Sequence, residues 1–208
     1  MGGGIIGADS ALEVSVKAET AKKILDLAWE LGALLSGDFT LTSGKKSHHY
    51  FEGKRLTLHP EGAYWVGKAM FDELTQVGVE AVGGVAVGGY SIVAAVALVS
   101  YLEGKPIPSF IVREQAKEHG TQRQIEGHFQ AGSRVAIVDD VITTGGSVKK
   151  AIQAVEAANG KVVKVIVIVD RHEGGSDQLK NEGYDFSAII DLWPSGEASI
   201  GESSATKK

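Results

Sequence analysis

The spacing of hydrophobic residues predicts a chain in which helices and strands alternate. In residues 18–35, apolar side chains recur every three or four positions, as on the buried face of a helix. A second stripe of this kind starts at His59-Pro60-Glu61, where the proline suits a first helical turn, and ends near Gly78. Residues 92–102 are almost all apolar, which predicts a buried helix.

Short continuous apolar runs between these helices predict buried strands. The expected strands are residues 81–87, 105–112, 135–138, 161–169 and 186–192, with a short helix over residues 176–183. Because residues 113–127 contain no amphipathic helix that could act as a crossover, we expect residues 107–112 to pair at an edge or to return antiparallel. The pattern as a whole predicts an α/β fold.

Residues 36–58 predict a small β-hairpin. Phe39 and Leu41 alternate with polar residues, a Ser-Gly turn follows, and Tyr50 and Phe51 begin a second short strand.

The expected hairpin also contains the adjacent pair His48 and His49. We interpret both as surface turn residues. No third ligand lies near them in the sequence, so we do not expect a metal site there.

The most informative stretch follows the expected strand 135–138, where Asp139 and Asp140 precede a turn of hydroxyl-bearing residues and glycines, 143–147. From Ser147 onward apolar residues take helical spacing. The N–H groups at a helix start suit a phosphate, and the two carboxylates suit sugar hydroxyls or a water-bound Mg²⁺. The Walker pattern is absent, since no Lys follows Gly146 directly, and G-x-G-x-x-G is absent as well.

Two further strand ends carry candidate binding groups. The pair Gly88-Gly89 would let the backbone approach a ligand closely, although tight packing explains it about as well. Arg171 follows the strand 161–169, so its guanidinium should reach the crevice where open α/β sheets bind ligands. It could bind a carboxylate of a ligand, or form a salt bridge with Asp170 or Glu173.

Residues 113–127 form a long polar segment without apolar periodicity. Such a segment beside a site is a candidate mobile lid, and its cations are Arg113, Lys117, Arg123 and, when protonated, His119. Composition alone favours the alternative, a solvated surface loop.

Composition narrows the class of protein. The 208 residues are 43% hydrophobic and 23% charged, which fits one globular domain over residues 1–208 with loose ends at 1–15 and 195–208. The net charge of −5 argues against nonspecific nucleic-acid binding, and the longest apolar run is too short to span a bilayer. The chain has no Cys, which fits a reducing compartment, so we expect a cytoplasmic protein.

Four motifs, in this order, resemble those of one enzyme family. They are F-x-L-x-S-G-x-x-S-x-x-Y-F from Phe39, R-x-x-x-K-x-H-G-T-x-x-x-I-E-G from Arg113, the acidic pair with its turn to Ser147, and D-R-x-E-G-G from Asp170. Together they resemble orotate phosphoribosyltransferases, which are type I phosphoribosyltransferases. The resemblance implies a central, mostly parallel sheet flanked by helices, with a small N-terminal hood subdomain formed here by residues 36–58.

The resemblance also implies a reaction, in which phosphoribosyl diphosphate (PRPP) donates its 5-phosphoribosyl group to N1 of orotate. The products would be orotidine 5′-monophosphate and diphosphate, in de novo pyrimidine biosynthesis. It further implies Mg²⁺ bound through PRPP, possible contact through water with Asp139 and Asp140, and a homodimer in which each lid reaches the neighbouring site.

Site residues follow from the same resemblance. The implied catalytic residues are Arg113, Lys117, His119 and Asp140. The implied PRPP-binding residues are Gly88, Gly89, Arg113, Lys117, His119, Asp139, Asp140, Val141, Ile142, Thr143, Thr144, Gly145, Gly146 and Ser147. The implied orotate-binding residues are Thr143 and Arg171, with the backbone of Tyr50 and Phe51 covering the ring.

Three positions depart from patterns in the family: many relatives carry Lys at the position of Thr42, some branches carry it at Gly88, and most carry it at Glu114. Two alternative functions stay open, and the departures at Thr42 and Glu114 bear on the second. One is a phosphoribosyltransferase for a purine base, which should lack the hood and lid motifs. The other is a PRPP-sensing regulator without turnover, which the acidic balance and the lack of a nucleic-acid-binding motif disfavour.

Overall fold

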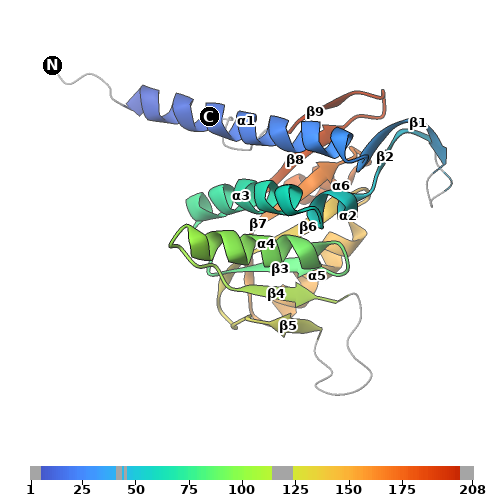
Figure 1. The fold of residues 1–208 in the computed structure, drawn as a ribbon. Helices are drawn as coiled ribbons and strands as arrows, with labels where there is room; N and C mark the ends of the chain where they lie inside the picture. Colours follow the sequence, from blue (N-terminus) through green and yellow to red (C-terminus); the bar gives the residue numbers. More distant parts are fainter. Residues whose placement is uncertain (1–5, 41–43, 45, 114–123, 202–208) are drawn as a thin grey trace.

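A seven-stranded sheet forms the centre of the computed structural model, which describes residues 6–40, 44, 46–113 and 124–201, without the side chains of 6–15 (Figure 1). The elements are α1 (Ile6–Glu30), β1 (Leu34–Thr40), β2 (Lys46–Phe51), α2 (Gly53–Thr57), α3 (Pro60–Val77), β3 (Ala81–Val85), α4 (Gly89–Leu102), β4 (Ser109–Val112), β5 (Ile125–Gly127), β6 (Arg134–Ile142), α5 (Gly146–Ala157), β7 (Lys161–Asp170), α6 (Gly175–Asn181), β8 (Phe186–Leu192) and β9 (Ala198–Ile200). This confirms the predicted α/β fold.

The sheet has the strand order β5-β4-β3-β6-β7-β8-β9. Its five inner strands run parallel, and the short edge strands β5 and β9 run antiparallel to their neighbours. Helices α1, α3 and α4 cover one face, whereas α5 and α6 cover the other (Figure 1). The hairpin β1–β2 forms a separate two-stranded sheet beside the main one, as predicted for the hood.

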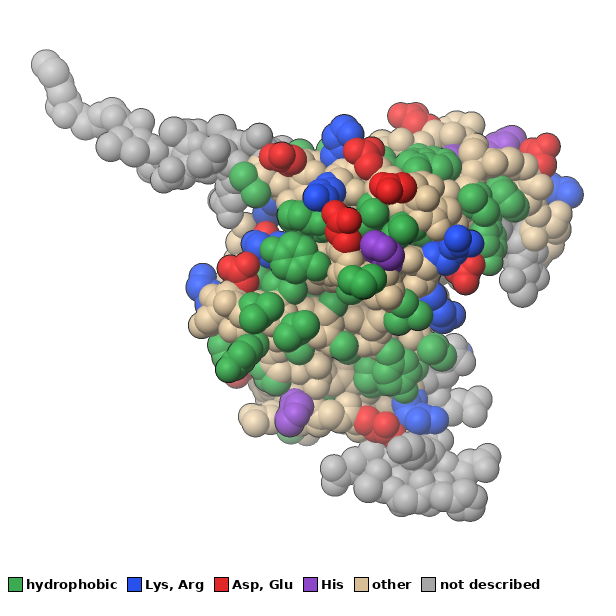
Figure 2. Space-filling model, viewed as in Figure 1, with side chains coloured by type: hydrophobic (Ala, Val, Ile, Leu, Met, Phe, Trp, Pro, Cys, Tyr) green, Lys and Arg blue, Asp and Glu red, His purple; other side chains and the backbone are tan. Residues whose placement is uncertain are grey.

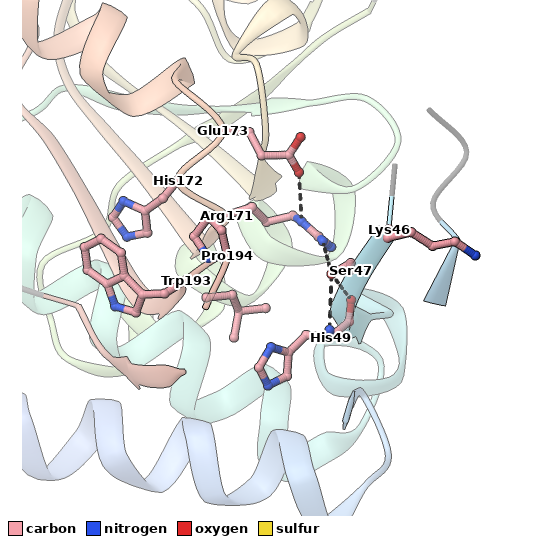
Figure 3. Close-up of a pocket in the computed structure, with 9 residues that line it drawn as sticks. Lys46, Ser47, His49, Arg171, His172, Glu173, Trp193 and Pro194 are labelled. Carbon is pink, nitrogen blue, oxygen red and sulfur yellow. Dashed lines mark hydrogen bonds and ion pairs between the residues drawn. The ribbon is translucent and has the colours of Figure 1, made fainter. Parts of the chain in front are cut away.

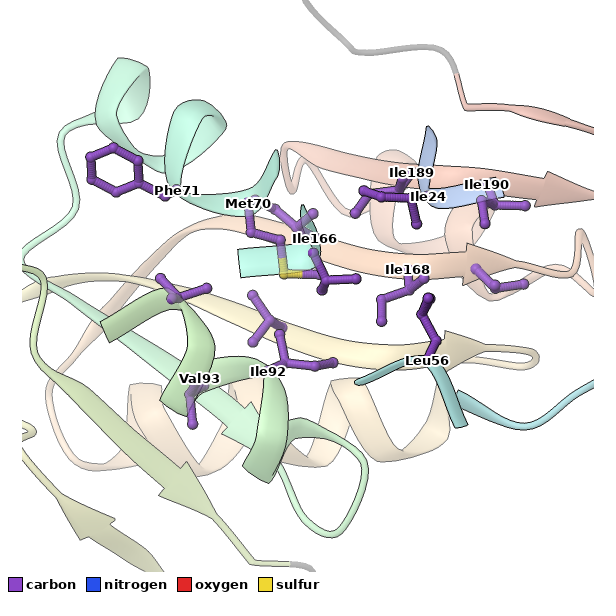
Figure 4. Close-up of a cluster of buried hydrophobic side chains, with 14 of the residues drawn as sticks. Ile24, Leu56, Met70, Phe71, Ile92, Val93, Ile166, Ile168, Ile189 and Ile190 are labelled. Carbon is purple, nitrogen blue, oxygen red and sulfur yellow. The ribbon is translucent and has the colours of Figure 1, made fainter. Parts of the chain in front are cut away.

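The two faces of the sheet bury two separate hydrophobic clusters. Alternate residues of a strand point to opposite faces, so Ala136 and Val138 of β6 pack towards α3 and α4, while Val135 and Ile137 pack towards α5. Figure 4 shows the first cluster, where Met70 of α3 lies above Ile166 of the sheet. Burial on both faces explains why these strands are continuous apolar runs in the sequence.

Helix α3 has the boundaries that its sequence predicted. Pro60 occupies the first turn, and Gly78 ends the helix with a left-handed φ of 68° while its N–H donates to the carbonyl of Leu74 at 3.1 Å.

Two predicted helix and strand assignments were wrong. The first helix ends at Glu30, because Gly32 takes a φ of 62° and Leu34 and Leu35 then pair with β2. Strand β4 is parallel to β3, because α4 already provides the crossover, and β5 is the strand that returns antiparallel.

The ends of the chain also differ from the prediction of loose segments 1–15 and 195–208. Helix α1 already begins at Ile6, and no proline or glycine interrupts the sequence between Gly7 and Gly32. In the tail, β9 pairs with β8 through the register Ile190↔Ile200, and the N–H of Gly201 donates to the carbonyl of Ile189.

None of the helices in the described part of the chain combines the length and apolarity that a bilayer crossing requires.

A buried ion pair joins α3 to the sheet. Lys164 of β7 is only 2% exposed, and its Nζ lies 2.7 Å from Oε1 of Glu73 and 2.9 Å from Oδ1 of Asp185. The hydroxyl of Ser187 also donates to Glu73. Burial of a charge is costly without partners, so this network holds β7, β8 and α3 in one arrangement.

We predict that Lys164→Met lowers the free energy of unfolding by about 3 kcal/mol, because it leaves the largely buried carboxylate of Glu73 without its cation. Urea unfolding measures the loss. The control is Lys22→Met, which removes a pair with Asp26 on the exposed surface of α1 and should cost about 0.5 kcal/mol or less. Equal losses in the two variants would contradict the assigned role of the buried pair.

Candidate active site

The turns that follow β3, β6 and β7 meet at one edge of the sheet, because parallel strands share the edge at which their carboxyl ends lie. Two backbone hydrogen bonds join the turns after β6 and β7. The N–H of Arg171 donates to the carbonyl of Ile142 at 3.1 Å, and the N–H of Gly175 donates to that of Thr143 at 2.9 Å. The predicted phosphate turn and the predicted arginine are therefore fixed relative to each other.

The acidic pair lies at the end of β6, as predicted. Asp139 is 5% exposed, its Oδ1 accepts the N–H of Asp140 at 2.9 Å, and its carboxylate also bonds to Ser147. Burial, and then the negative charge of Asp140, raise the pKa of Asp139 well above its usual range. Asp139 therefore keeps its proton to a higher pH than an exposed aspartate would.

Two glycines enclose the side chain of Asp140. A Cβ on Gly88 would lie 2.4 Å from Oδ1 of Asp140, and a Cβ on Gly53 would lie 2.8 Å from Oδ2. Both distances are too short for a real contact, so the carboxylate keeps this place only while both positions lack a side chain. Gly88 was predicted for the site, whereas Gly53 was missed; its one signal in the sequence is a glycine two residues after the aromatic pair Tyr50-Phe51.

The turn 143–147 leads into α5 with the geometry of an anion cradle. Gly145 has a φ of 79° and precedes the first helical residue, Gly146. The turn packs closely on Gly175, where a Cβ would lie 2.6 Å from the carbonyl oxygen of Thr143. A Cβ on Gly146 would meet no described atom within 4 Å, so no described group crowds the start of α5 at this residue, and the first turn of a helix has N–H groups without intrahelical partners.

Arg171 lies between the sheet and the hood. Its side chain is 11% exposed, its Nε donates to Oε1 of Glu173 at 3.2 Å, and its Nη2 donates to Oγ of Ser47 at 2.8 Å (Figure 3). The salt bridge with Glu173 was one of the predicted alternatives. The bond to Ser47 of β2 was not predicted, because it joins residues that are far apart in the sequence.

A cavity of about 300 Å³ separates the hood from the ends of β7 and β8 (Figure 3). Its lining comprises Lys46, Ser47, His49, Arg171, His172, Glu173, Leu192, Trp193 and Pro194. Of the four residues predicted to bind orotate, Arg171 lines it and Thr143 belongs to the adjoining turn. Tyr50 is half-exposed against the ring of Phe39, while Phe51 is part of the hydrophobic core.

His49 corrects the prediction that both histidines of the hood are surface residues. The side chains of β2 alternate, so Ser47, His49 and Phe51 face inward while His48 and Tyr50 face solvent. His49 is 4% exposed, with its ring 5.8 Å from that of Trp29. Burial, then the positive charges of Arg171 and His48, lower its pKa, so His49 is neutral over a wider pH range than a free histidine.

The predicted lid is described only at its two ends. The N–H of Arg113 donates to the carbonyl of Gln124 at 3.0 Å, and the side-chain amide of Gln124 donates back at 2.9 Å. The predicted boundary at Gly127 was too late, because β5 occupies the last three residues of the segment. The predictions for Lys117 and His119, and the departures at Thr42 and Glu114, lie outside the described residues.

Comparisons with known proteins agree with this geometry. Residues 65–197 match the family model described as "Phosphoribosyl transferase domain". The orotate phosphoribosyltransferase of a Nostoc species is 41% identical over 172 residues, which cover 82% of this chain and 82% of that protein.

Solved structures give the same result. Orotate phosphoribosyltransferase of Mycobacterium tuberculosis in complex with Fe(III) dicitrate has 33% identity and a TM-score of 0.70, over 85% of this chain and 96% of that one. The same enzyme in complex with PRPP has 29% identity and a TM-score of 0.67, with the same coverage. By sequence and by fold, this chain belongs to the orotate phosphoribosyltransferase family.

Proposed function

We propose that this chain transfers the 5-phosphoribosyl group of PRPP to N1 of orotate, giving orotidine 5′-monophosphate and diphosphate in de novo pyrimidine biosynthesis. The proposal rests on one observation: the start of α5, the acidic pair Asp139–Asp140 and Arg171 lie together at one edge of the sheet. These groups match, respectively, the phosphate and ribose of the donor and the carboxylate of the acceptor. A purine base has no carboxylate for Arg171, which favours orotate over the purine alternative.

The donor would bind along the end of β6. Thr143, Thr144, Gly145, Gly146 and Ser147 would hold the 5-phosphate through backbone N–H groups and hydroxyls, helped by the positive end of the α5 dipole. Asp139 and Asp140 would accept hydrogen bonds from the ribose hydroxyls, with Val141 and Ile142 continuing the strand beneath. The backbone at Gly88 and Gly89 would approach the diphosphate, because no side chain blocks it.

The donor set also fits Mg²⁺, which prefers oxygen ligands and keeps several waters. Asp139 and Asp140 would contact, through water, the hydrated ion that PRPP brings; Asp139 is the more deeply buried of the two. When bound, the ion neutralises charge on the diphosphate.

The acceptor would bind between the turn after β7 and the hood. Arg171 would hold the carboxylate of orotate, since a guanidinium forms two parallel hydrogen bonds with such a group. Thr143 would contact the ring from the adjoining turn, and the backbone of Tyr50 and Phe51 would cover it. Glu173 and Ser47 keep the guanidinium at this junction.

Catalysis would depend on stabilising the leaving diphosphate, because the carbon under attack becomes cationic as the bond to diphosphate breaks. The lid cations Arg113, Lys117 and His119 would supply positive charge and exclude water that would hydrolyse PRPP. The carboxylates of Asp139 and Asp140 and the imidazole of His119 are the candidates for receiving the orotate proton.

A homodimer is part of the same proposal. Figure 2 shows hydrophobic side chains gathered over α3 and α4, and the exposed members include Tyr64, Tyr90, Leu98, Tyr101 and Leu102. An apolar patch of this kind is typical of a protein interface. The resemblance to the family further implies that, in such a homodimer, each lid reaches the neighbouring site. The cytoplasmic location expected from the sequence stays a prediction.

An absorbance assay tests the proposed function. With PRPP and Mg²⁺ the purified chain should consume orotate, and it should leave uracil and hypoxanthine unchanged. Consumption of hypoxanthine instead would identify a purine enzyme. Binding of PRPP without consumption of any base would identify a regulator, and either result would overturn the proposal.

We predict that Arg171→Ala raises the KM for orotate roughly ten- to a hundredfold, the effect of losing a charge-assisted hydrogen bond of about 1.5–3 kcal/mol. The KM for PRPP should change little. Arg134→Ala, at the opposite end of β6, is the matched control and should leave both constants unchanged. An unaltered orotate KM in Arg171→Ala would refute the carboxylate assignment.

We predict that Gly53→Ala raises the KM for PRPP about tenfold, because the added methyl group displaces the carboxylate of Asp140 from the ribose hydroxyls. Steady-state kinetics at saturating orotate measure the change. Lys54→Ala, at the exposed neighbouring position of α2, is the control and should behave as wild type. If both variants kept the wild-type KM, Gly53 would have no part in placing Asp140.

A further inference from the structure

His172 has an uncommon backbone conformation in the turn that carries Arg171. Its φ is 51°, and Asn159 is the other non-glycine residue with a positive φ in the described part of the chain. This left-handed conformation is unfavourable for residues that have a Cβ, so it persists where surrounding groups hold it. The contacts of His172 show what holds it here.

Both the backbone and the ring of His172 have fixed partners. Its N–H donates to Oδ1 of Asp170 at 2.9 Å, and its Nε2 lies 3.0 Å from Oδ1 of Asp191. Its Nδ1 faces Oδ2 of Asp170 at 3.7 Å. The two aspartates are register partners at the ends of β7 and β8, so the ring bridges adjacent strands.

A third contact fixes the plane of the ring. The imidazole lies flat on the indole of Trp193, with ring centroids 3.6 Å apart and an interplanar angle of 6°. Trp193 is itself anchored in the β8–β9 hairpin, where its N–H donates to the carbonyl of Glu197 and its Nε1 donates to Ser199. The β8–β9 hairpin thus supports the turn after β7 through the contact between Trp193 and His172.

A metal site is the competing interpretation of this cluster. Ligand atoms of Asp170, His172 and Asp191 all lie within 4.8 Å of one another, a spacing that could hold an ion. However, the imidazole presents one nitrogen to each carboxylate, and one ion can bind only one of the two nitrogens. The flat stack on Trp193 also orients the ring. The arrangement therefore fits a group of contacts that holds His172 in place better than it fits a metal centre, and we call the contacts of His172 with Asp170, Asp191 and Trp193 the clamp.

We propose that His172 is a positioning residue: held by Asp170, Asp191 and Trp193, it keeps the turn after β7 in the conformation that presents Arg171 to the carboxylate of the acceptor. The inference rests on the proposed function. His172 lines the same cavity as Arg171, and we assign its effect to Arg171, whose guanidinium donates to Ser47 of the hood at 2.8 Å (Figure 3). The residue occupies the variable position of the D-R-x-E-G-G motif, so no family motif assigned it a role.

Steady-state kinetics of three variants test the clamp. His172→Gly keeps the left-handed backbone accessible and removes the ring, so it isolates what the ring contributes. His172→Gly and Trp193→Ala should each raise the KM for orotate about tenfold, while the KM for PRPP stays within about twofold of wild type. Trp193→Phe keeps an aromatic face for the imidazole and should restore most of the wild-type KM for orotate.

The matched control is Asn159→Gly, the same replacement at the other left-handed residue, in the turn between α5 and β7. It should leave both KM values unchanged, and thermal unfolding should show that all four variants are folded at the assay temperature. An unchanged KM for orotate in His172→Gly, or equal rises in both KM values, would overturn the clamp.

The clamp and the proposed function fail in different ways. If wild type consumes orotate and Arg171→Ala raises its KM while His172→Gly does not, the clamp alone is wrong. If wild type does not consume orotate, both proposals are wrong.

Discussion

The parallel alignment of β3, β6 and β7 is the constraint on which the site depends. It is maintained because both faces of these strands are buried, with alternate residues of β6 in separate hydrophobic clusters. Parallel strands have their carboxyl ends at one edge, so three turns with different chemistry converge there. The hydrogen bond from the N–H of Gly175 to the carbonyl of Thr143 then fixes the turn that carries Arg171 against the turn 143–147.

At that edge, the position of the Asp140 carboxylate depends on glycines, which leave room that any other residue would fill. Asp140 fits between Gly53 and Gly88, and the turn to α5 fits against Gly175. Arg171, in contrast, is placed by partners on two elements: Glu173 in its own turn and Ser47 in the hood. The hood therefore helps to place Arg171 through Ser47, and Trp193 of the β8–β9 hairpin packs against His172 in the same turn.

The sequence predicted best those features whose cause is local. An apolar run, two acids and a hydroxyl-glycine turn are adjacent in the chain, and β6, its turn and α5 formed where expected. His49 was mispredicted because its burial depends on Trp29 and on the inward face of β2. The strand β9 was missed because three residues form a strand there only beside the edge of β8, and Gly53 was missed because its partner, Asp140, is distant in the chain.

We infer above all that this edge of the sheet binds the donor at the acidic pair and the turn after it. A crystal structure of the chain with PRPP and Mg²⁺ tests it most directly. We expect the 5-phosphate on the backbone N–H groups of residues 144–147 and the ribose hydroxyls within hydrogen-bonding distance of Asp139 and Asp140. PRPP bound at another place, with Asp140 and the turn free of ligand, would contradict it.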